Sequence, residues 1–153
     1  MLKTNSFRCA FIFSIICLLS FTSDKPSTDG LIEDVLNYTN QFRRSKGLKV
    51  LEMRDDLNAI ARSHSEDMAK GRCSFGHDGY NLRVSKIKKT IKPCDGYIGE
   101  NVAYGAPNGK EAVETWKNSS AHRKNMLGDY KYIGIGTASN KKGIIYYTQI
   151  FVR

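Results

Sequence analysis

The sequence has little proline, no glycine triplet period, no sustained heptads and no internal repeat. Proline occurs three times in 153 residues. These absences exclude collagen-like, coiled-coil and solenoid architectures. With 41% hydrophobic and 25% charged residues, the chain has enough apolar surface for a packed core. Its length predicts one domain, since chains divide into separate cores only beyond about 250 residues.

Acidic residues are also scarce relative to basic ones. Twenty-four Lys and Arg against fifteen Asp and Glu give a formal net charge of +9. This surplus favours anionic partners such as phosphate-bearing surfaces and acidic lipids. The basic run at 83–92 is either a solvated helix face or a contact for anionic lipid headgroups or glycosaminoglycan. Nucleic acid is not an expected partner, because the N-terminus indicates export.

The N-terminus has the features of an export signal. Its first eight residues carry two bases and no acid, and the apolar run at 9–21 is too short for a membrane span of about 20 residues. Small residues favour cleavage after Thr22, while lipid attachment at Cys17 and an uncleaved anchor are alternatives. We expect a secreted protein or one held at a bacterial outer surface. The predicted division is a signal peptide or lipoprotein-type anchor at 1–22, a linker at 23–30 and a domain at 31–153.

Cysteine use agrees with export. Two of the four cysteines lie in the signal, which leaves Cys73 and Cys94 as the only pair in the exported chain. A disulfide between them would close a loop of 21 residues and would stabilise the fold by about 3 kcal/mol. Two unlinked buried thiols are the alternative. A metal site at this pair is not indicated, because the spacing is not C-x-x-C.

Hydrophobic periodicity predicts helices followed by a closing β-hairpin. Apolar residues at helical spacing, glycine stops and capping residues mark the helices. Runs rich in Ile, Tyr and Thr mark the last two strands. The predicted elements are helices at 31–46, from a cap at Asp55 or Asp56 to the stop at Gly71, at 80–89 and, after the cap Asn108, at 109–118, then an extended segment at 96–104 and strands at 132–138 and 144–152. This order indicates an α+β fold.

Three histidines and one glutamate stand out by their positions. His64 lies on the apolar stripe of the second predicted helix, which favours a hydrogen-bonded core histidine. His77 lies in a glycine-flanked loop and His122 in a polar run after a Trp-containing helix, so hydrophobic periodicity demands neither imidazole. Glu100 is a lone charge in an extended segment, where a buried carboxylate is costly unless it is paired or acts as a ligand. The alternative to a shared site is that these polar residues are scattered.

Five motifs follow one another in an order that resembles the CAP superfamily of cysteine-rich secretory proteins, antigen 5 and pathogenesis-related 1 proteins. They are H-D-G at 77–79, G-E-N-V-A at 99–103, E-T-W-K-N-S-S-A-H-R-K-N-M-L at 114–127, Y-I-G-I-G at 132–136 and Y-T-Q-I-F at 147–151. The resemblance covers about residues 31–153 and is closest to the short bacterial branch with an SCP-type domain. The short signal and the lysine-rich composition would suit a spirochaetal outer-surface member. The resemblance implies an α-β-α sandwich with a central three-stranded antiparallel sheet and a surface cleft.

The family's cleft presents two histidines and two acids, and in several members the histidines bind a divalent metal. The matching residues here are His77, Glu100 and His122, whereas Ser119 replaces the second acid three positions after Trp116. The resemblance therefore implies a ligand-binding cleft with an incomplete tetrad at these four positions. It also leaves open a Zn or other divalent metal site at His77 and His122, with Glu100 as a third ligand.

We expect a protein that acts by binding and is not an enzyme. In a hydrolase Glu100 would have to be both metal ligand and base, and Ser119 has no nucleophile elbow or oxyanion loop beside it. The expected ligand is a small apolar molecule, a sterol, fatty acid or phospholipid, or a host macromolecule, because some family members bind sterols or fatty acids. One alternative is a metal-dependent hydrolase that uses His77, His122 and Glu100. The other is an adhesin or immune-facing surface protein that contacts a host surface protein or an anionic polysaccharide.

Overall fold

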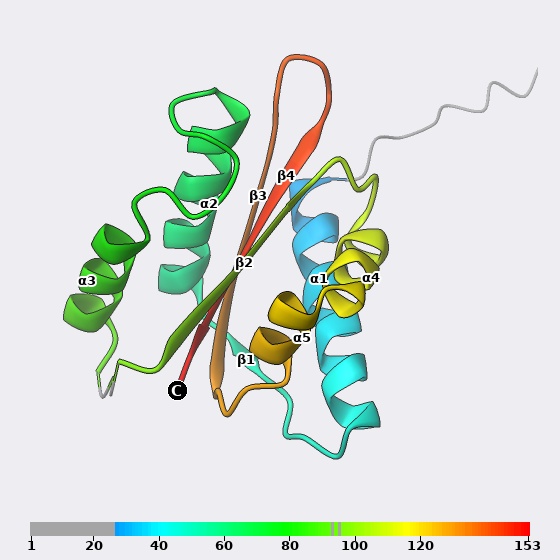
Figure 1. Ribbon diagram of the computed structural model, residues 1–153, viewed down its shortest axis with the longest axis vertical. Coiled ribbons are helices and arrows are strands. Elements are labelled where there is room, and N and C mark those ends of the chain that lie inside the picture. The colour runs from blue at the N-terminus through cyan, green and yellow to red at the C-terminus, as the bar shows by residue number, and fades with distance from the viewer. Residues whose placement is uncertain (1–26, 93, 95) are drawn as a thin grey trace, which may run out of the picture.

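Helices cover both faces of one sheet in this computed structural model, which describes residues 27–92, 94 and 96–153 (Figure 1). The predicted signal at 1–22 lies outside these residues. The elements in chain order are α1 (Thr28–Ser45), β1 (Glu52–Met53), α2 (Asp55–Ala69), α3 (Tyr80–Thr90), β2 (Ile98–Tyr104), α4 (Gly109–Asn118), α5 (Ser120–Met126), β3 (Tyr132–Ser139) and β4 (Ile145–Val152). The expected α+β sandwich is confirmed. Within the described ranges, no helix is long and apolar enough to cross a membrane.

The sheet formed by the described residues has four strands in the order β1-β3-β4-β2. β4 pairs antiparallel with both β3 and β2, whereas the two-residue β1 pairs parallel with β3. The predicted three-stranded antiparallel sheet is therefore present, with one short strand added. Hydrophobic alternation could not have indicated β1, because both of its residues are exposed.

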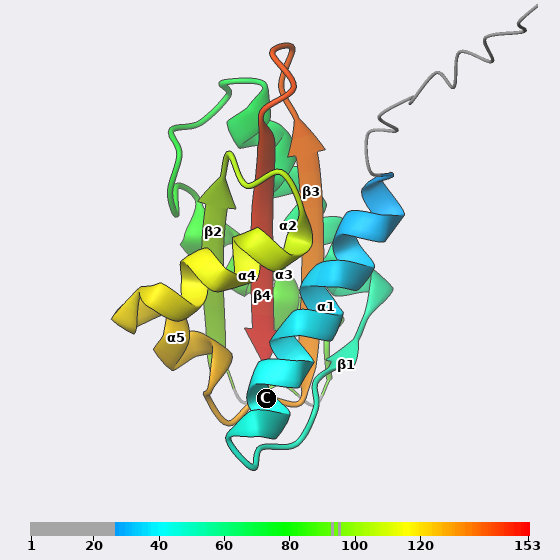
Figure 2. The same cartoon turned by 90° about the vertical axis from the view of Figure 1, so that its right-hand side faces the viewer.

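Two apolar clusters form the core, one on each side of the sheet. α1, α4 and α5 cover one face, where Trp116 and Phe151 are fully buried (Figure 2). α2 and α3 cover the other face, where Leu57, Ile87 and Ile150 are buried. All members of both clusters fall between residues 31 and 152. The part of the chain after the predicted signal therefore holds a complete core of its own.

The structure explains the helix boundaries through their caps. Asn108 caps α4 as predicted, because its Oδ1 accepts a hydrogen bond from the backbone N–H of Glu111 at 2.9 Å. α1 begins at Thr28, before the predicted domain start at 31, because the Ser27 hydroxyl accepts from the Gly30 N–H at 3.1 Å. The predicted aspartate cap of α2 is wrong, since Arg54 holds the cap position and its side chain accepts no capping hydrogen bond from the backbone of the helix.

α2 packs against β3 at two glycines of the Y-I-G-I-G motif. A Cβ atom at Gly134 would collide with Leu57, and one at Gly136 would collide with the backbone of Ala61 and Arg62. The hydroxyl of Ser65 also donates a hydrogen bond to the carbonyl of Gly136 at 2.9 Å. Glycine is therefore required at these positions because the helix backbone approaches the strand closely.

The predicted disulfide is absent, because Cys73 and Cys94 are both free cysteines. Cys73 follows α2 and Cys94 follows α3, and these helices end at opposite ends of the molecule (Figure 1). The eleven residues of α3 span about 16 Å, whereas a disulfide requires Cα atoms within about 7 Å. Cys94 instead packs against the apolar cluster under α3. The alternative of two unlinked thiols is the one that the structure contains.

A buried arginine joins the end of α1 to the turn between α5 and β3. The Arg43 guanidinium donates hydrogen bonds to the carbonyls of Lys49 at 2.9 Å, Met126 at 2.8 Å and Gly128 at 2.9 Å. Burial is the largest influence on this group and lowers the pKa of Arg43. The side chain therefore fixes one end of the molecule from within.

Candidate functional site

The candidate site lies at the outer edge of β2, where the α2–α3 loop, α3 and α5 approach the strand. Because β2 is an edge strand, its outward carbonyls need partners from outside the sheet. Three side chains donate to them: Tyr80 to Ile98 at 2.8 Å, Asn125 to Glu100 at 3.0 Å and Trp116 to Val102 at 3.0 Å. These bonds close the edge to another strand, so the accessible surface here is built from side chains.

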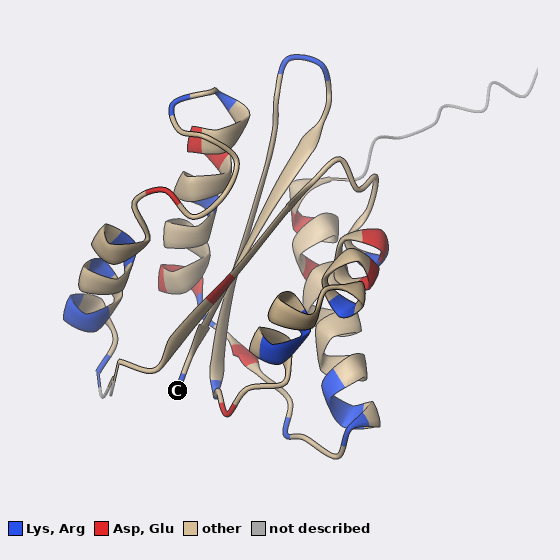
Figure 3. Cartoon of the chain, viewed as in Figure 1, with Lys and Arg blue, Asp and Glu red and all other residues tan. Residues whose placement is uncertain are grey.

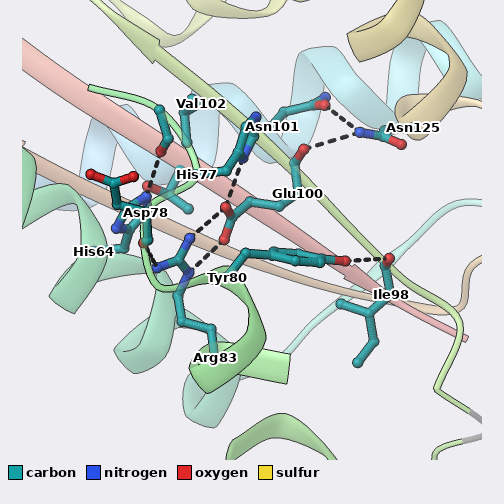
Figure 4. A network of polar contacts seen from close by, with 12 residues as sticks. His64, His77, Asp78, Tyr80, Arg83, Ile98, Glu100, Asn101, Val102 and Asn125 are labelled. Atoms are coloured by element: carbon teal, nitrogen blue, oxygen red, sulfur yellow. Dashed lines mark hydrogen bonds and ion pairs between the residues drawn. The ribbon is translucent and has the colours of Figure 1, made fainter. Parts of the chain in front are cut away.

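Glu100 is the buried centre of the site, with a side chain that is 2% exposed. Arg83 donates two hydrogen bonds to its carboxylate, from Nε at 2.7 Å and from Nη2 at 2.6 Å. His77 Nδ1 lies 2.8 Å from Oε1 of the same carboxylate (Figure 4). The expectation that a carboxylate here must be paired is confirmed, since only such partners offset its loss of water.

Arg83 is one of the site residues that sequence reasoning missed. The sequence places it within the basic run at 83–92, yet its side chain is only 12% exposed. Its Nη1 also donates to the carbonyl of Asp78 at 2.6 Å. One signal could have found it: Ile87, the buried residue of α3, lies four positions later. Residues four apart share a helix face, so Arg83 belongs to the inner face of α3.

His77 lies at the rim, with 49% of its side chain exposed. Because an ionised carboxylate only accepts hydrogen bonds, its bond to Glu100 places the proton of the neutral ring on Nδ1. Nε2 then presents a lone pair, and none of the residues in the described ranges donates to it. The pair therefore orients the imidazole and leaves one ring nitrogen available to a ligand.

His122 lies at the same edge but does not line the same hollow. Its backbone carbonyl accepts a hydrogen bond from the Asn101 side chain at 3.1 Å. Its ring Nδ1 is buried and has no hydrogen-bond partner in the described part of the chain. Burial, and then the nearby His77, lower the pKa of His122. Ser119 is the N-cap of α5, so its hydroxyl has a structural role.

A solvent-open hollow of about 230 Å³ lies beside Glu100 and His77. It is lined by His77, Tyr80, Ile98, Gly99, Glu100 and Asn125. The hollow thus unites two of the four predicted cleft residues and leaves out Ser119 and His122. Tyr80 and Asn125 are additional polar members that no local sequence pattern distinguished.

The sequence that forms this hollow matches a known protein family. The cysteine-rich secretory protein family, CAP, matches residues 36–151. The chain belongs to the CAP family. The resemblance that the motifs indicated is therefore confirmed, and the hollow lies within the CAP domain.

Three relatives show how far the similarity extends. The CAP domain is 36% identical over 129 residues to the uncharacterized membrane protein YlbC of Bacillus subtilis strain 168, covering 79% of this chain and 34% of that protein. It is 28% identical to an extracellular SCP-domain protein of Bacillus anthracis strain Ames, with a TM-score of 0.71, covering 82% and 41%. An outer surface protein of Borrelia burgdorferi shares the fold, with a TM-score of 0.73 and 20% identity, covering 84% and 96%. The chain thus spans only about a third of the length of YlbC.

Glu100 is engaged by another residue and is not a free metal ligand. Both of its carboxylate oxygens accept hydrogen bonds from Arg83. Over residues 27–92, 94 and 96–153, no group of three or more His, Cys, Asp or Glu residues is placed to hold a metal ion. The described residues therefore do not form a three-ligand set from His77, His122 and Glu100, and metal binding by the two histidines stays a prediction.

His64 is a core histidine, as predicted. It is buried, and its Nε2 lies 2.8 Å from the carbonyl of Gly76. Gly76 directly precedes His77, so this bond fixes the loop that carries the exposed imidazole. Burial is the largest influence on His64 and lowers its pKa.

The CAP domain is expected to lose stability as the pH falls from about 7 to 5. Because the folded-state pKa of His64 is lowered, the unfolded chain takes up a proton below about pH 6.5 that the folded chain does not. The loss for His64 is at most about 1.4 kcal/mol per pH unit. Urea unfolding of the wild type and His64→Gln at several pH values measures this slope, which should flatten in the variant. Equal slopes would contradict the assignment.

Proposed function

We propose that this CAP domain is an exported binding domain whose cleft along β2 holds a sugar chain of a polysaccharide. The observation that carries the proposal is a pair of exposed aromatic rings beside the His77 hollow. Phe75 is 49% exposed and Tyr104 is 56% exposed, and their ring centroids lie 4.6 Å apart. Tyr146 stacks on Tyr104 with centroids 5.7 Å apart. The three rings form an aromatic shelf, of which Phe75 and Tyr104 are exposed to solvent.

The aromatic shelf and the hollow lie along one side of β2. Alternate strand residues project to the same side, so Glu100 and Tyr104 share a side and are separated by about 13 Å. Phe75 precedes His77 by two positions in the same loop. The faces of aromatic rings stack against the C–H faces of sugar rings, and His77 and Asn125 offer hydrogen bonds to hydroxyl groups. A short run of linked sugars matches this spacing.

The same geometry favours a polymer over a free lipid. The hollow of about 230 Å³ is smaller than the pockets of about 300–1,000 Å³ that enclose small ligands, and its polar lining does not suit a sterol or fatty acid. A metal-dependent hydrolase is disfavoured because Glu100 is engaged by Arg83. Binding of an exposed polysaccharide is instead consistent with the adhesin alternative.

Export is supported by two independent lines. The predicted signal at 1–22 has a basic start and an apolar run of signal length. Relatives include an extracellular SCP-domain protein and an outer surface protein. A ligand outside the cell is therefore the appropriate class for this proposal.

The test uses residues 23–153, which contain the complete core, and neutral tetrasaccharides of N-acetylglucosamine and of glucose as probes. We expect at least one probe to shift the amide NMR signals of Phe75, His77 and Tyr104. Phe75→Ala and Tyr104→Ala should each weaken binding about two- to tenfold, since an aromatic contact contributes about 0.5–1.5 kcal/mol.

Leu82→Ala is the matched control, because Leu82 is a large exposed apolar residue on α3 outside the cleft. It should leave the affinity unchanged. The proposal fails if neither tetrasaccharide shifts these signals, or if a fatty acid or sterol binds at micromolar concentration and competes at the same residues.

A further inference from the structure

Basic residues lie at both ends of the molecule, and one end gathers those from the ends of three helices (Figure 3). α1, α3 and α5 all finish at this end (Figure 1), and each has two basic residues in its last turn. The bonds from Arg43 to Met126 and Gly128 hold the ends of α1 and α5 together. We define the basic end by six exposed cations: Arg44, Lys46, Lys88, Lys89, Lys124 and Lys131.

Nearby acids do not neutralise the basic end. Asp56 is bound by Arg54 at 2.7 Å, and Asp129 lies 3.6 Å from Arg153. In the described ranges, none of the six cations takes part in an ion pair. Glu52 lies beside Lys131, since its backbone N–H donates to the Lys131 carbonyl at 2.9 Å, and it is a single acid against six cations. Asp29, in the first turn of α1, lies at the opposite end. The net positive charge is therefore distributed unevenly over the surface.

Helix stability alone does not explain this concentration. A cation in the last turn interacts favourably with the helix dipole by about 0.3–1 kcal/mol, which favours basic residues at each helix end separately. The helix dipole does not require that three helices, from both sides of the sheet, end at the same end of the molecule. It also does not explain Lys131, which lies outside any helix. The convergence produces a positive field over one continuous end of the molecule.

The geometry points to a linear polymer with repeated sulfate or phosphate groups as the partner of the basic end. α1 and α3 lie on opposite faces of the sheet (Figure 2), so one small anion cannot reach the cations of both. A polymer can place several anionic groups against these cations at the same time. After the first contact, each further contact forms within the complex, which raises the overall affinity. This surface is separate from the β2 cleft, and its binding does not depend on the aromatic shelf.

A membrane surface fits the basic end less well. α1 begins at the opposite end of the molecule (Figure 1), so any N-terminal anchor would join the domain there. In such an anchored form the basic end would be the end distant from the point of attachment.

The decisive test compares two pairs of adjacent exposed lysines in residues 23–153. Lys88→Glu/Lys89→Glu changes the basic end, while Lys141→Glu/Lys142→Glu changes the β3–β4 turn at the opposite end by the same charge. Heparin and inorganic polyphosphate are the probes. At low salt the first variant should bind at least one of them about tenfold more weakly than the wild type, and the second less than about twofold more weakly.

Three further measurements make the outcome decisive. Arg44→Glu/Lys46→Glu should also weaken binding, because a polymer would span both sides of the basic end. Comparing the affinities for heparin and for polyphosphate distinguishes a sulfated from a phosphorylated partner. Circular dichroism checks that each variant is folded. Equal losses of affinity in the two lysine variants would mean that binding depends only on the net charge of the protein, and would overturn the proposal. Binding to phosphatidylglycerol vesicles, with no binding to either polymer, would also overturn it.

Discussion

Gly136→Ala is expected to lower the free energy of unfolding by about 4 kcal/mol. The added methyl group would meet the backbone of Ala61 and Arg62 in α2, and backbone cannot rotate away as a flexible side chain can. Overpacking against side chains costs about 1–3 kcal/mol, occasionally more, so a clash with backbone should cost on the order of 4 kcal/mol. Domains are stable by only about 5–15 kcal/mol, so this loss is large.

Urea unfolding of purified Gly136→Ala and wild type measures this loss. Gly30→Ala is the matched control, because its added methyl group would meet only the Ser27 hydroxyl, at 3.3 Å. Gly30 lies in helix α1, where alanine is the better helix former, so this variant should be as stable as the wild type or slightly more. A loss below about 1 kcal/mol for Gly136→Ala would show that α2 moves away from β3 at little cost.

Arg43→Ala is expected to be the second severe change. It removes the donor to the carbonyls of Lys49, Met126 and Gly128, and a buried acceptor left unpaired costs about 1–3 kcal/mol. Because water can enter the space and satisfy some of these groups, we expect a total loss of about 4 kcal/mol. The lost bonds join α1 to the turn before β3, so that end should open first.

Chemical denaturation and amide hydrogen exchange test the arginine prediction together. Arg44→Ala, at the next position on the exposed side of α1, should change stability by no more than about 0.5 kcal/mol. In Arg43→Ala, exchange should accelerate in the turn between α5 and β3 before it does in α2. Similar stabilities for the two variants would show that the three carbonyls do not need the guanidinium.

Much of the fold could be predicted because local and tertiary preferences agree. Asn108 is both a good cap and the start of an amphipathic helix, and α4 covers the predicted residues. The two long strands of the hairpin are apolar and β-branched, and they pair as expected. β1 and α5 were missed because each is short and obtains its stability from neighbouring elements, which no local pattern records.

The candidate site was only partly predictable for a related reason. Glu100 and His77 are unusual among their sequence neighbours, so the amino-acid sequence alone distinguishes them. Arg83 is surrounded by other basic residues, and only its position on the buried side of α3 separates it from them. Ser119 became a candidate through the family pattern, whereas its place before α5 gives it the role of a helix cap.

The side chains that satisfy the outer carbonyls of β2 affect how the protein behaves at high concentration. Tyr80, Trp116 and Asn125 occupy the acceptors that a neighbouring copy would need in order to add its own strand. Exposed strand edges are a common route to aggregation and fibre formation. A neighbouring copy therefore cannot add a strand at β2 without displacing these three side chains, which disfavours association through this edge at high protein concentration.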